Sequence, residues 1–250
     1  MGNIFYLDKG PHNSDVLVLV HGAGCNHGIW SSQVEYLSDS HRVIALDLPG
    51  HGLSPGPSRK HISDYTEVVR KLAKLVTGDK RFFIGGHSMG GAIAMNYALT
   101  YPEDLKGIIL VATGSRLRVN KAILDSYEKG EHFDHLIDYA ISKNASNKIR
   151  NELLEIMADI PPRVCFDDYR ACDNFDVGDR LPDIRKPTLV VCGDEDVLTP
   201  SKYSEFLSKN IPGSQFKMIK GSGHFLPVEK PYYLNKTINS FLAAIREQEV

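Results

Sequence analysis

Short apolar runs alternate with amphipathic stretches along most of this chain. Mostly apolar runs suit parallel strands buried on both faces, and they occur at 16–20, 42–46, 81–84, 107–112 and 188–192. Weaker strand patterns occur at 4–7 and 215–219. Helical patterns lie between them, at 29–37, 65–76, 91–99, 201–209 and 231–246. This alternation predicts an α/β fold with a mostly parallel central sheet flanked by helices on both faces.

The alternation stops between residues 115 and 181. This segment has helical spacing in pieces, at 123–127, 133–141 and 149–160, and no apolar run typical of a buried strand. A stretch of this length without a strand is uncommon in a compact domain unless it is functional. We interpret it as a helical cap, at about 115–181, inserted into a single domain that spans 1–250.

Aromatic residues of this predicted cap are candidates to line a pocket beneath it. Their large apolar side chains suit a small-molecule site, although packing between the cap's own helices explains each of them equally well. The candidates are Phe133, Tyr139, Phe166 and Tyr169.

The apolar run at 81–84 stops at a serine enclosed by glycines. The sequence there is Gly86-His87-Ser88-Met89-Gly90-Gly91, and a helical pattern of small residues follows. Glycines two positions before and after a serine allow strand and helix to approach closely, so that the serine occupies a strained turn with its hydroxyl exposed. An incidental serine in a glycine-rich turn is the alternative, but the order of strand, motif and helix argues against it. We therefore predict a nucleophile at Ser88.

Other predicted strands are followed by residues that could act together with a nucleophilic serine. A glycine loop spans 21–24, an acidic turn spans 194–196, and His224 follows the last strand. Carboxyl ends of strands in an open α/β sheet meet at one edge. They would bring together a hydroxyl, an imidazole, a carboxylate and backbone donors for an oxyanion. The order of serine, acid and histidine is the one found in α/β-hydrolases.

The chain resembles the α/β-hydrolase superfamily in five ordered motifs. A serine at the elbow differs from the aspartate of haloalkane dehalogenases and epoxide hydrolases, and the Ser-Met-Gly-Gly elbow is similar to serine carboxylesterases and monoacylglycerol-lipase-like members. The matching motifs are His21-Gly22-Ala23-Gly24, the segment from Asp47 to Ser54, the elbow around Ser88, Gly193-Asp194-Glu195-Asp196 with Pro200, and Gly223-His224.

The resemblance implies a role for each site residue. Ser88 attacks an acyl carbonyl while His224 takes its proton, and water activated by the same histidine hydrolyses the acyl-enzyme. The backbone N–H groups of Ala23 and Met89 hold the oxyanion. The resemblance selects Asp196 as the acid that orients the histidine.

Two other aspartates remain alternatives for the acid. The family places the acid three residues after the strand-end glycine, which is Gly193 in this chain. Asp194 is the main alternative to Asp196, although hydrogen bonds from its carboxylate to the backbone amides of the turn also explain its position. Asp47 is a weaker rival because it precedes the serine, and its surroundings resemble a structural turn of the family.

The remaining histidines have simpler interpretations. We expect His21 and His51 to hydrogen-bond loop backbone near the site and His87 to be buried beside the elbow, while His27 is a candidate to reach the pocket. His12, His41 and His61 resemble surface turn residues. Neither a metal-binding histidine pair nor a complete dinucleotide or phosphate-binding loop is present.

Composition narrows the class of protein. The chain has 250 residues, 42% of them hydrophobic, and its formal charge of -2 provides no strong field for nucleic acid or an anionic membrane. No apolar run approaches the roughly 18 residues of a membrane span. Residues 1–6 lack a signal-peptide pattern, so we expect a cytoplasmic protein. The four cysteines are scattered, which favours reduced thiols; Cys192 suits the core and Cys25 a pocket wall.

These observations predict a serine hydrolase that cleaves small or medium carboxylic acyl esters. It would act on a small-molecule substrate with neither metal nor organic cofactor. The same triad also serves lactonases, carbon–carbon bond hydrolases and perhydrolases, and a ligand receptor that retains a slow triad is a further alternative. Whether the protein is a monomer or a homodimer is left open by the sequence.

Overall fold

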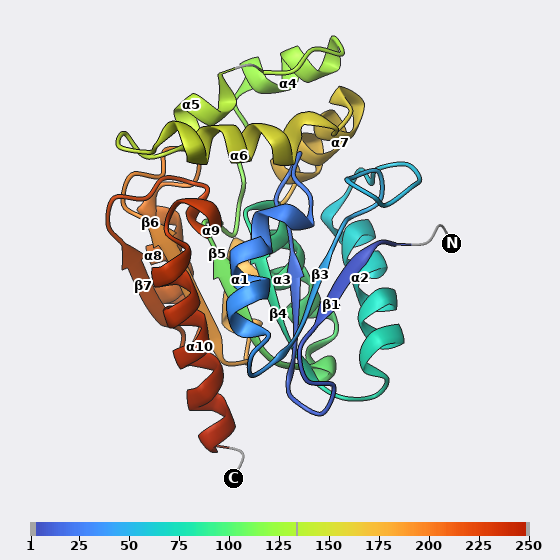
Figure 1. The fold of residues 1–250 in the computed structure, drawn as a ribbon, viewed down its shortest axis with the longest axis vertical. Coiled ribbons are helices and arrows are strands. Elements are labelled where there is room, and N and C mark those ends of the chain that lie inside the picture. Colours follow the sequence, from blue (N-terminus) through green and yellow to red (C-terminus); the bar gives the residue numbers. More distant parts are fainter. Residues whose placement is uncertain (1–3, 134, 249–250) are drawn as a thin grey trace.

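A seven-stranded sheet forms the centre of the computed structural model, which describes residues 4–133 and 135–248 (Figure 1). The strand order is β1-β3-β2-β4-β5-β6-β7. Strand β1 is antiparallel to β3, and the other neighbours are parallel, which confirms the predicted mostly parallel sheet. The strands are β1 (Tyr6–Lys9), β2 (Val16–Val20), β3 (Arg42–Leu46), β4 (Phe82–His87), β5 (Leu105–Val111), β6 (Thr188–Gly193) and β7 (Gln215–Ile219).

Helices cover both faces of the sheet, as predicted. One apolar cluster joins α2 (Ile62–Thr77), α3 (Met89–Thr100) and α8 (Ser201–Asn210) to one face. A second cluster joins α1 (Ser31–Leu37) and α10 (Pro231–Gln248) to the other face. Successive strand residues point to opposite faces, so Ile84 belongs to the first cluster and Phe83 to the second. Shorter helices are η1 (His27–Trp30), η2 (Pro102–Asp104), η3 (Gly178–Asp183) and α9 (Leu226–Glu229).

The last helix packs on the sheet as its pattern predicts. Phe241 of α10 lies against Phe83, with ring centroids 6.5 Å apart. The helix continues to Gln248, two residues beyond the predicted pattern at 231–246, while 249–250 lie outside the described residues. The signal-peptide assessment rests partly on 1–3, which also lie outside them. No helix in the described part of the chain is long and apolar enough to cross a membrane.

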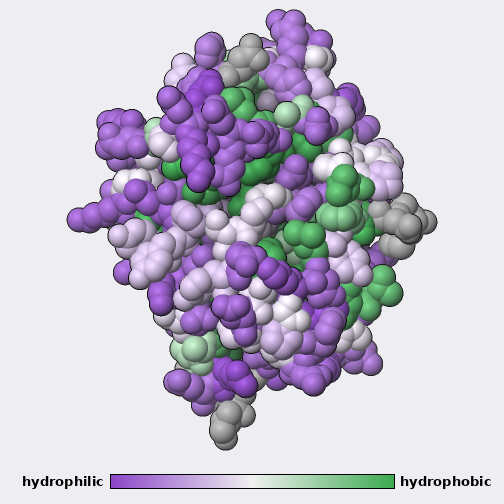
Figure 2. Space-filling model, viewed as in Figure 1, coloured by the Kyte–Doolittle hydropathy of each residue, from purple (hydrophilic) through white to green (hydrophobic). Residues whose placement is uncertain are grey.

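Helices α4 to α7 lie together over the end of the sheet opposite the C-terminus, and we call them the cap (Figure 1). They share a small apolar cluster of their own. Figure 2 shows that the visible face is mainly hydrophilic, with apolar side chains showing through among the cap helices. The cap helices are α4 (Lys121–Glu128), α5 (Leu136–Ala140), α6 (Asn147–Ala158) and α7 (Pro162–Asp173).

Helix α7 was not predicted by the apolar pattern. Asp167 and Asp168 are buried on this helix beside apolar positions, and two carboxylates interrupt the spacing that reveals an amphipathic helix. Helix α6 ends at Ala158, and α7 begins at Pro162 with Pro161 as its N-cap. The predicted piece at 133–141 includes residue 134, which lies outside the described residues; α5 occupies its later part.

Candidate active site

Ser88 occupies the sharp turn between β4 and α3. Its φ of 53° and ψ of -115° are unusual for a residue with a side chain, so the turn is strained. A Cβ atom on Gly86 would lie 2.0 Å from the carbonyl oxygen of Gly90. One on Gly90 would lie 2.2 Å from the carbonyl oxygen of Val20. Only glycine therefore permits this approach of strand and helix, as the sequence predicted.

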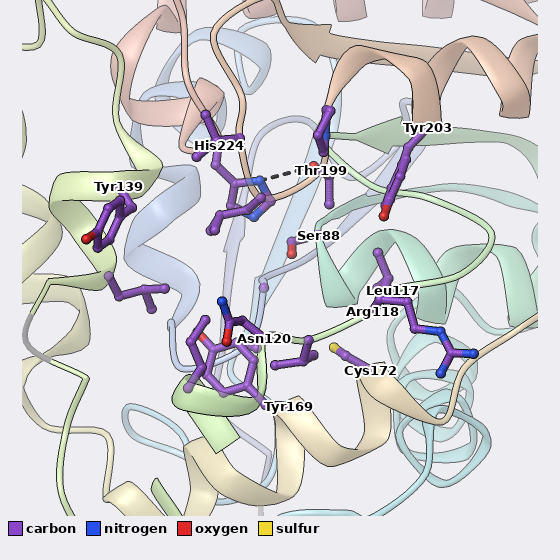
Figure 3. A pocket seen from close by; sticks show the side chains of 18 of the residues that line it. Ser88, Leu117, Arg118, Asn120, Tyr139, Tyr169, Cys172, Thr199, Tyr203 and His224 are labelled. Atoms are coloured by element: carbon purple, nitrogen blue, oxygen red, sulfur yellow. Dashed lines mark hydrogen bonds between the residues drawn. The ribbon is translucent and has the colours of Figure 1, made fainter. Parts of the chain in front are cut away.

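Ser88 and His224 line one cavity of about 630 Å³ between the strand ends and the cap. Figure 3 shows the side chains of Ser88 and His224 among those that line this pocket. A cavity of this size suits a small or medium ligand. Predicted lining residues that do face it are Cys25, Phe133, Tyr139 and Tyr169.

Phe166 does not line this cavity, which corrects one of the aromatic candidates. It packs with the apolar cluster of the cap, and the guanidinium of Arg163 lies 5.3 Å from its ring centroid. Tyr169, three positions further along α7, does face the cavity and also stacks on Tyr127 of α4. Both aromatic residues are on α7, and the direction in which each side chain leaves the helix decides which of them lines the cavity.

Asp196 is the carboxylate that contacts His224. Its Oδ2 atom lies 2.9 Å from His224 Nδ1 and accepts a hydrogen bond from the Thr199 hydroxyl at 2.7 Å. Its Oδ1 atom accepts from the backbone N–H groups of Leu198 and Thr199 at 2.9 and 2.8 Å. Burial would raise the pKa of Asp196, but the charge of His224 and these hydrogen bonds outweigh it and lower that pKa. The carboxylate therefore stays ionised beside the imidazole.

The two rival aspartates have other partners. Asp194 is exposed, and its carboxylate accepts a hydrogen bond from the backbone N–H of Gly221 at 2.7 Å. Asp47 is fully buried and accepts from the backbone N–H groups of His27 and Leu53. The His27 ring lies 2.8 Å from the same carboxylate, so it is directed to Asp47 and not into the pocket. Both acids stabilise turns.

His87 supports the loop that carries His224. Its Nε2 atom lies 2.9 Å from the carbonyl oxygen of His224, so Nε2 carries the proton and donates. Burial, with a smaller contribution from the charge of His224, lowers the pKa of His87 to about 3, and the ring is neutral. The expectation that His87 is buried beside the elbow is confirmed.

The two predicted oxyanion donors lie in different segments, one directly after Ser88 and one in the loop after β2. Met89 is the first residue of α3, where backbone N–H groups have no acceptor within the helix and the helix dipole favours negative charge. Ala23 lies in the loop after β2 and lines the cavity. The backbone N–H of Gly24, the next residue, donates to Asp168 of the cap at 3.0 Å.

Asp168 is a buried residue that the sequence analysis missed. Besides Gly24, it accepts hydrogen bonds from the Tyr65 hydroxyl at 2.5 Å and from His51 Nε2 at 2.7 Å. Burial would lower the pKa of His51, but the charge and hydrogen bond of Asp168 raise it. An aspartate among buried positions of α7 is the only signal in the sequence, and it does not reveal the partners.

A second set of contacts joins the cap to the histidine loop. The backbone N–H of His224 donates to the carbonyl oxygen of Ala140 at 2.6 Å. Glu229 is buried, and its Oε2 atom accepts from the backbone N–H groups of Gly223 and Ser142 at 3.0 and 2.8 Å. The cap thus contacts both the oxyanion loop and the histidine loop.

Three other histidines were predicted to lie on the surface. His12 and His61 are exposed, but His41 is buried, so that expectation was wrong. Its backbone packs against the turn at Gly10, where a Cβ atom would lie 2.1 Å from the His41 carbonyl oxygen. His21 Nε2 accepts from the backbone N–H of Leu48 at 3.0 Å, which confirms its predicted contact with loop backbone.

The cysteines are all buried and free. Burial raises the pKa of Cys25 far above its ordinary value, so the thiol facing the cavity is protonated. Cys192 is fully buried at the end of β6, as predicted. Across 4–133 and 135–248, no group of three or more histidine, cysteine, aspartate or glutamate side chains is placed to hold a metal ion.

Residues 17–235 match the model of the alpha/beta hydrolase family, and the chain therefore belongs to this family and is a hydrolase. The resemblance given by the motifs is confirmed. A curated relative, 3-oxoadipate enol-lactonase 1 of Acinetobacter baylyi, is 24% identical over 95% of this chain and 92% of its own length.

Solved structures of related proteins have the same fold. A thermophilic esterase from Thermogutta terrifontis, solved with malate bound, matches with a TM-score of 0.88 and 26% identity over 97% of this chain and 93% of that one. Est816, described as an N-acyl homoserine lactone degrading enzyme, matches with a TM-score of 0.85 and 28% identity over 95% of this chain and 96% of that one. These relatives act on esters or lactones.

Proposed function

We propose that this protein hydrolyses carboxylic esters of small or medium acyl groups through a covalent acyl-enzyme on Ser88. The observation that carries the proposal is the 2.9 Å contact between His224 Nδ1 and Asp196 Oδ2, together with a cavity that both His224 and Ser88 line. With Nδ1 bound to the carboxylate, Nε2 of His224 is left to accept a proton from the serine.

The proposed reaction has two halves. In the first, Ser88 Oγ bonds to the acyl carbonyl carbon, His224 takes the hydroxyl proton, and the alcohol leaves with that proton. In the second, His224 takes a proton from water as the water oxygen bonds to the acyl carbon, the bond from that carbon to Ser88 Oγ breaks, and His224 returns the proton to Ser88 as the acid leaves. The backbone N–H groups of Ala23 and Met89 would hold the oxyanion in both halves, and losing one such donor typically costs about 2.7–4 kcal/mol of barrier.

Lactone hydrolysis is the second candidate function. A lactone is a cyclic ester, so the same attack opens its ring and leaves the alcohol attached to the acid. The relatives described as an enol-lactonase and a lactone-degrading enzyme favour this candidate. The cavity of about 630 Å³ admits either substrate class.

A hydrolysis profile tests both candidates. We would measure kcat/KM on para-nitrophenyl esters of increasing acyl length and on a matched panel of lactones, for the natural chain and for Ser88→Ala. We expect turnover that falls at the longest chains and is lost in Ser88→Ala while the variant stays folded. Preference for lactones over open esters would favour the second function. Tight binding with negligible turnover across both panels would favour a receptor.

A further inference from the structure

A second cavity adjoins the proposed catalytic pocket. It measures about 770 Å³ and is lined by the segment after β5, by η3 and the residues just before it, and by α8. Three residues line both cavities, namely Arg118, Lys202 and Tyr203. A ligand whose reactive carbonyl reaches Ser88 can therefore extend past these residues into the second space.

The charged groups of the second cavity are mostly paired. Arg116 contacts Asp176 at 3.3 Å, and Arg180 contacts Asp183 at 3.5 Å. Asp179 is a further carboxylate on the wall, and it is exposed. With Arg116, Arg118, Arg180 and Lys202 against Asp176 and Asp179, the wall carries a formal excess of two positive charges.

The two cations shared by the cavities are the ones without a carboxylate partner. Among the residues that the structure describes, Arg118 has no hydrogen bond or ion pair. Within residues 4–133 and 135–248, the ammonium of Lys202 has only the ring of Tyr203 as a partner, at 6.0 Å from its centroid. Both side chains are exposed, so their charges are free to bind an anion from solution.

The direction of Arg118 determines where such an anion would lie. Figure 3 shows its side chain leaving the segment beside Leu117 with the guanidinium directed away from Ser88, on the same side of the pocket as Tyr203. Apolar residues, Leu117 and Ile123 among them, line the first cavity together with Ser88. An anion would thus be held at a distance from the reacting carbonyl, with an apolar spacer between them.

We propose that Arg118 and Lys202 form a subsite for a carboxylate carried by the substrate several bonds from the scissile carbonyl. The substrate class is then an ester or lactone of a carboxylated acyl chain or a carboxylated alcohol. This inference rests on the proposed function, since it places the scissile carbonyl at Ser88. Both cations are exposed, so salt screens their attraction for the carboxylate.

The test compares esters that differ in charge and have the same length. Mono-para-nitrophenyl suberate and para-nitrophenyl octanoate place the carboxylate on the acyl side. The octanoyl ester of 3-(para-hydroxyphenyl)propanoate and the same compound as its methyl ester place it on the alcohol side. The measured quantity is the ratio of kcat/KM for the charged ester to kcat/KM for its neutral counterpart.

We expect this ratio to fall about threefold in Arg118→Gln or Lys202→Gln and about tenfold in the double variant, in one of the two arms. High salt should lower the ratio of the natural chain in the same arm. Arg180→Gln is the matched control, because it removes an exposed cation that lines only the second cavity, and it should keep the natural ratio. If the double variant keeps the charged-to-neutral ratio of the natural chain in both arms, the proposed subsite is wrong.

A binding measurement separates failure of the subsite from failure of the proposed function. In the Ser88→Ala background, monomethyl suberate should raise the melting temperature more than dimethyl suberate does, and the Arg118→Gln/Lys202→Gln changes should remove this difference. Absence of any ester turnover with this difference intact would contradict the proposed function alone. Ester turnover with equal melting shifts for both compounds would contradict the subsite alone.

Discussion

The strand ends and the cap meet at one cavity but build it differently. Asp196 is held within its own turn, as in the hydrogen bonds from Thr199, and Ser88 occupies the sharp turn between β4 and α3. The cap acts over long separations, and Asp168 binds the backbone N–H of Gly24 from 144 positions away. In the proposed mechanism the strand ends therefore supply the reactive groups, whereas the cap aligns them and shapes the space for the ligand.

The largest expected effect concerns the strand-end turn that holds the acid. Asp196→Asn removes the charge that orients His224, and kcat should fall about 10⁴-fold, as for the acid of other serine triads. Asp194→Asn changes an exposed carboxylate on the same turn and should lower kcat by less than about fivefold. Steady-state kinetics on a para-nitrophenyl ester measure both. A larger loss of kcat for Asp194→Asn than for Asp196→Asn would show that Asp194, and not Asp196, is the acid.

The next effect tests whether the cap aligns the oxyanion loop. Asp168→Asn weakens the acceptor of Gly24, Tyr65 and His51, so the backbone beside Ala23 should shift and kcat should fall about 10- to 100-fold. KM should change little, because the oxyanion contact strengthens in the transition state.

Asp167→Asn is the matched control for this variant. Asp167 is buried on the same helix but binds the Ser58 hydroxyl and Arg163, so kcat should stay within about threefold of the natural value. Thermal melting checks that both variants fold. Equal losses of kcat in the two variants would show that Asp168 stabilises the cap in general and does not align the loop that carries Ala23.

The contact between His51 and Asp168 predicts a pH dependence of stability. The pKa of His51 is raised above 6.5 in the folded protein, so protonated His51 favours folding. That contribution is complete below pH 6.5 and is lost as the pH rises through the folded pKa. The unfolding free energy of the natural chain should exceed that of His51→Gln most near about pH 6 and less near about pH 9, as urea denaturation can measure. A difference that grows with pH would contradict this sign.

The smallest expected effect concerns Cys25, which faces the cavity from the loop that also carries Ala23. Its thiol is buried and its pKa is raised, so iodoacetamide at neutral pH should leave ester hydrolysis within about twofold of the untreated value. Mass spectrometry of the treated protein would show whether Cys25 is alkylated. Rapid alkylation with loss of activity would show that the cavity wall opens readily.

The same division between strand ends and cap explains what the sequence could predict. Strands and the elbow at Ser88 depend on local patterns and on the common edge of a parallel sheet, and these are visible in one sequence. The choice of Asp196 over Asp194 as the partner of His224 came from the family resemblance. The partners of Asp168, the burial of His41 and the orientation of Phe166 depend on packing between segments far apart in the chain. Such packing has no periodic signal, so the pocket wall was the least predictable part.

Trapping the acyl-enzyme tests the central claim most directly. The protein would be mixed with para-nitrophenyl octanoate, quenched in acid within its first turnovers, digested and analysed by mass spectrometry. We predict a peptide containing Ser88 that has gained the mass of one octanoyl group in place of a proton, and no such peptide from Ser88→Ala. Ester turnover by the natural chain with no acyl group on Ser88, or unchanged turnover by Ser88→Ala, would contradict the account.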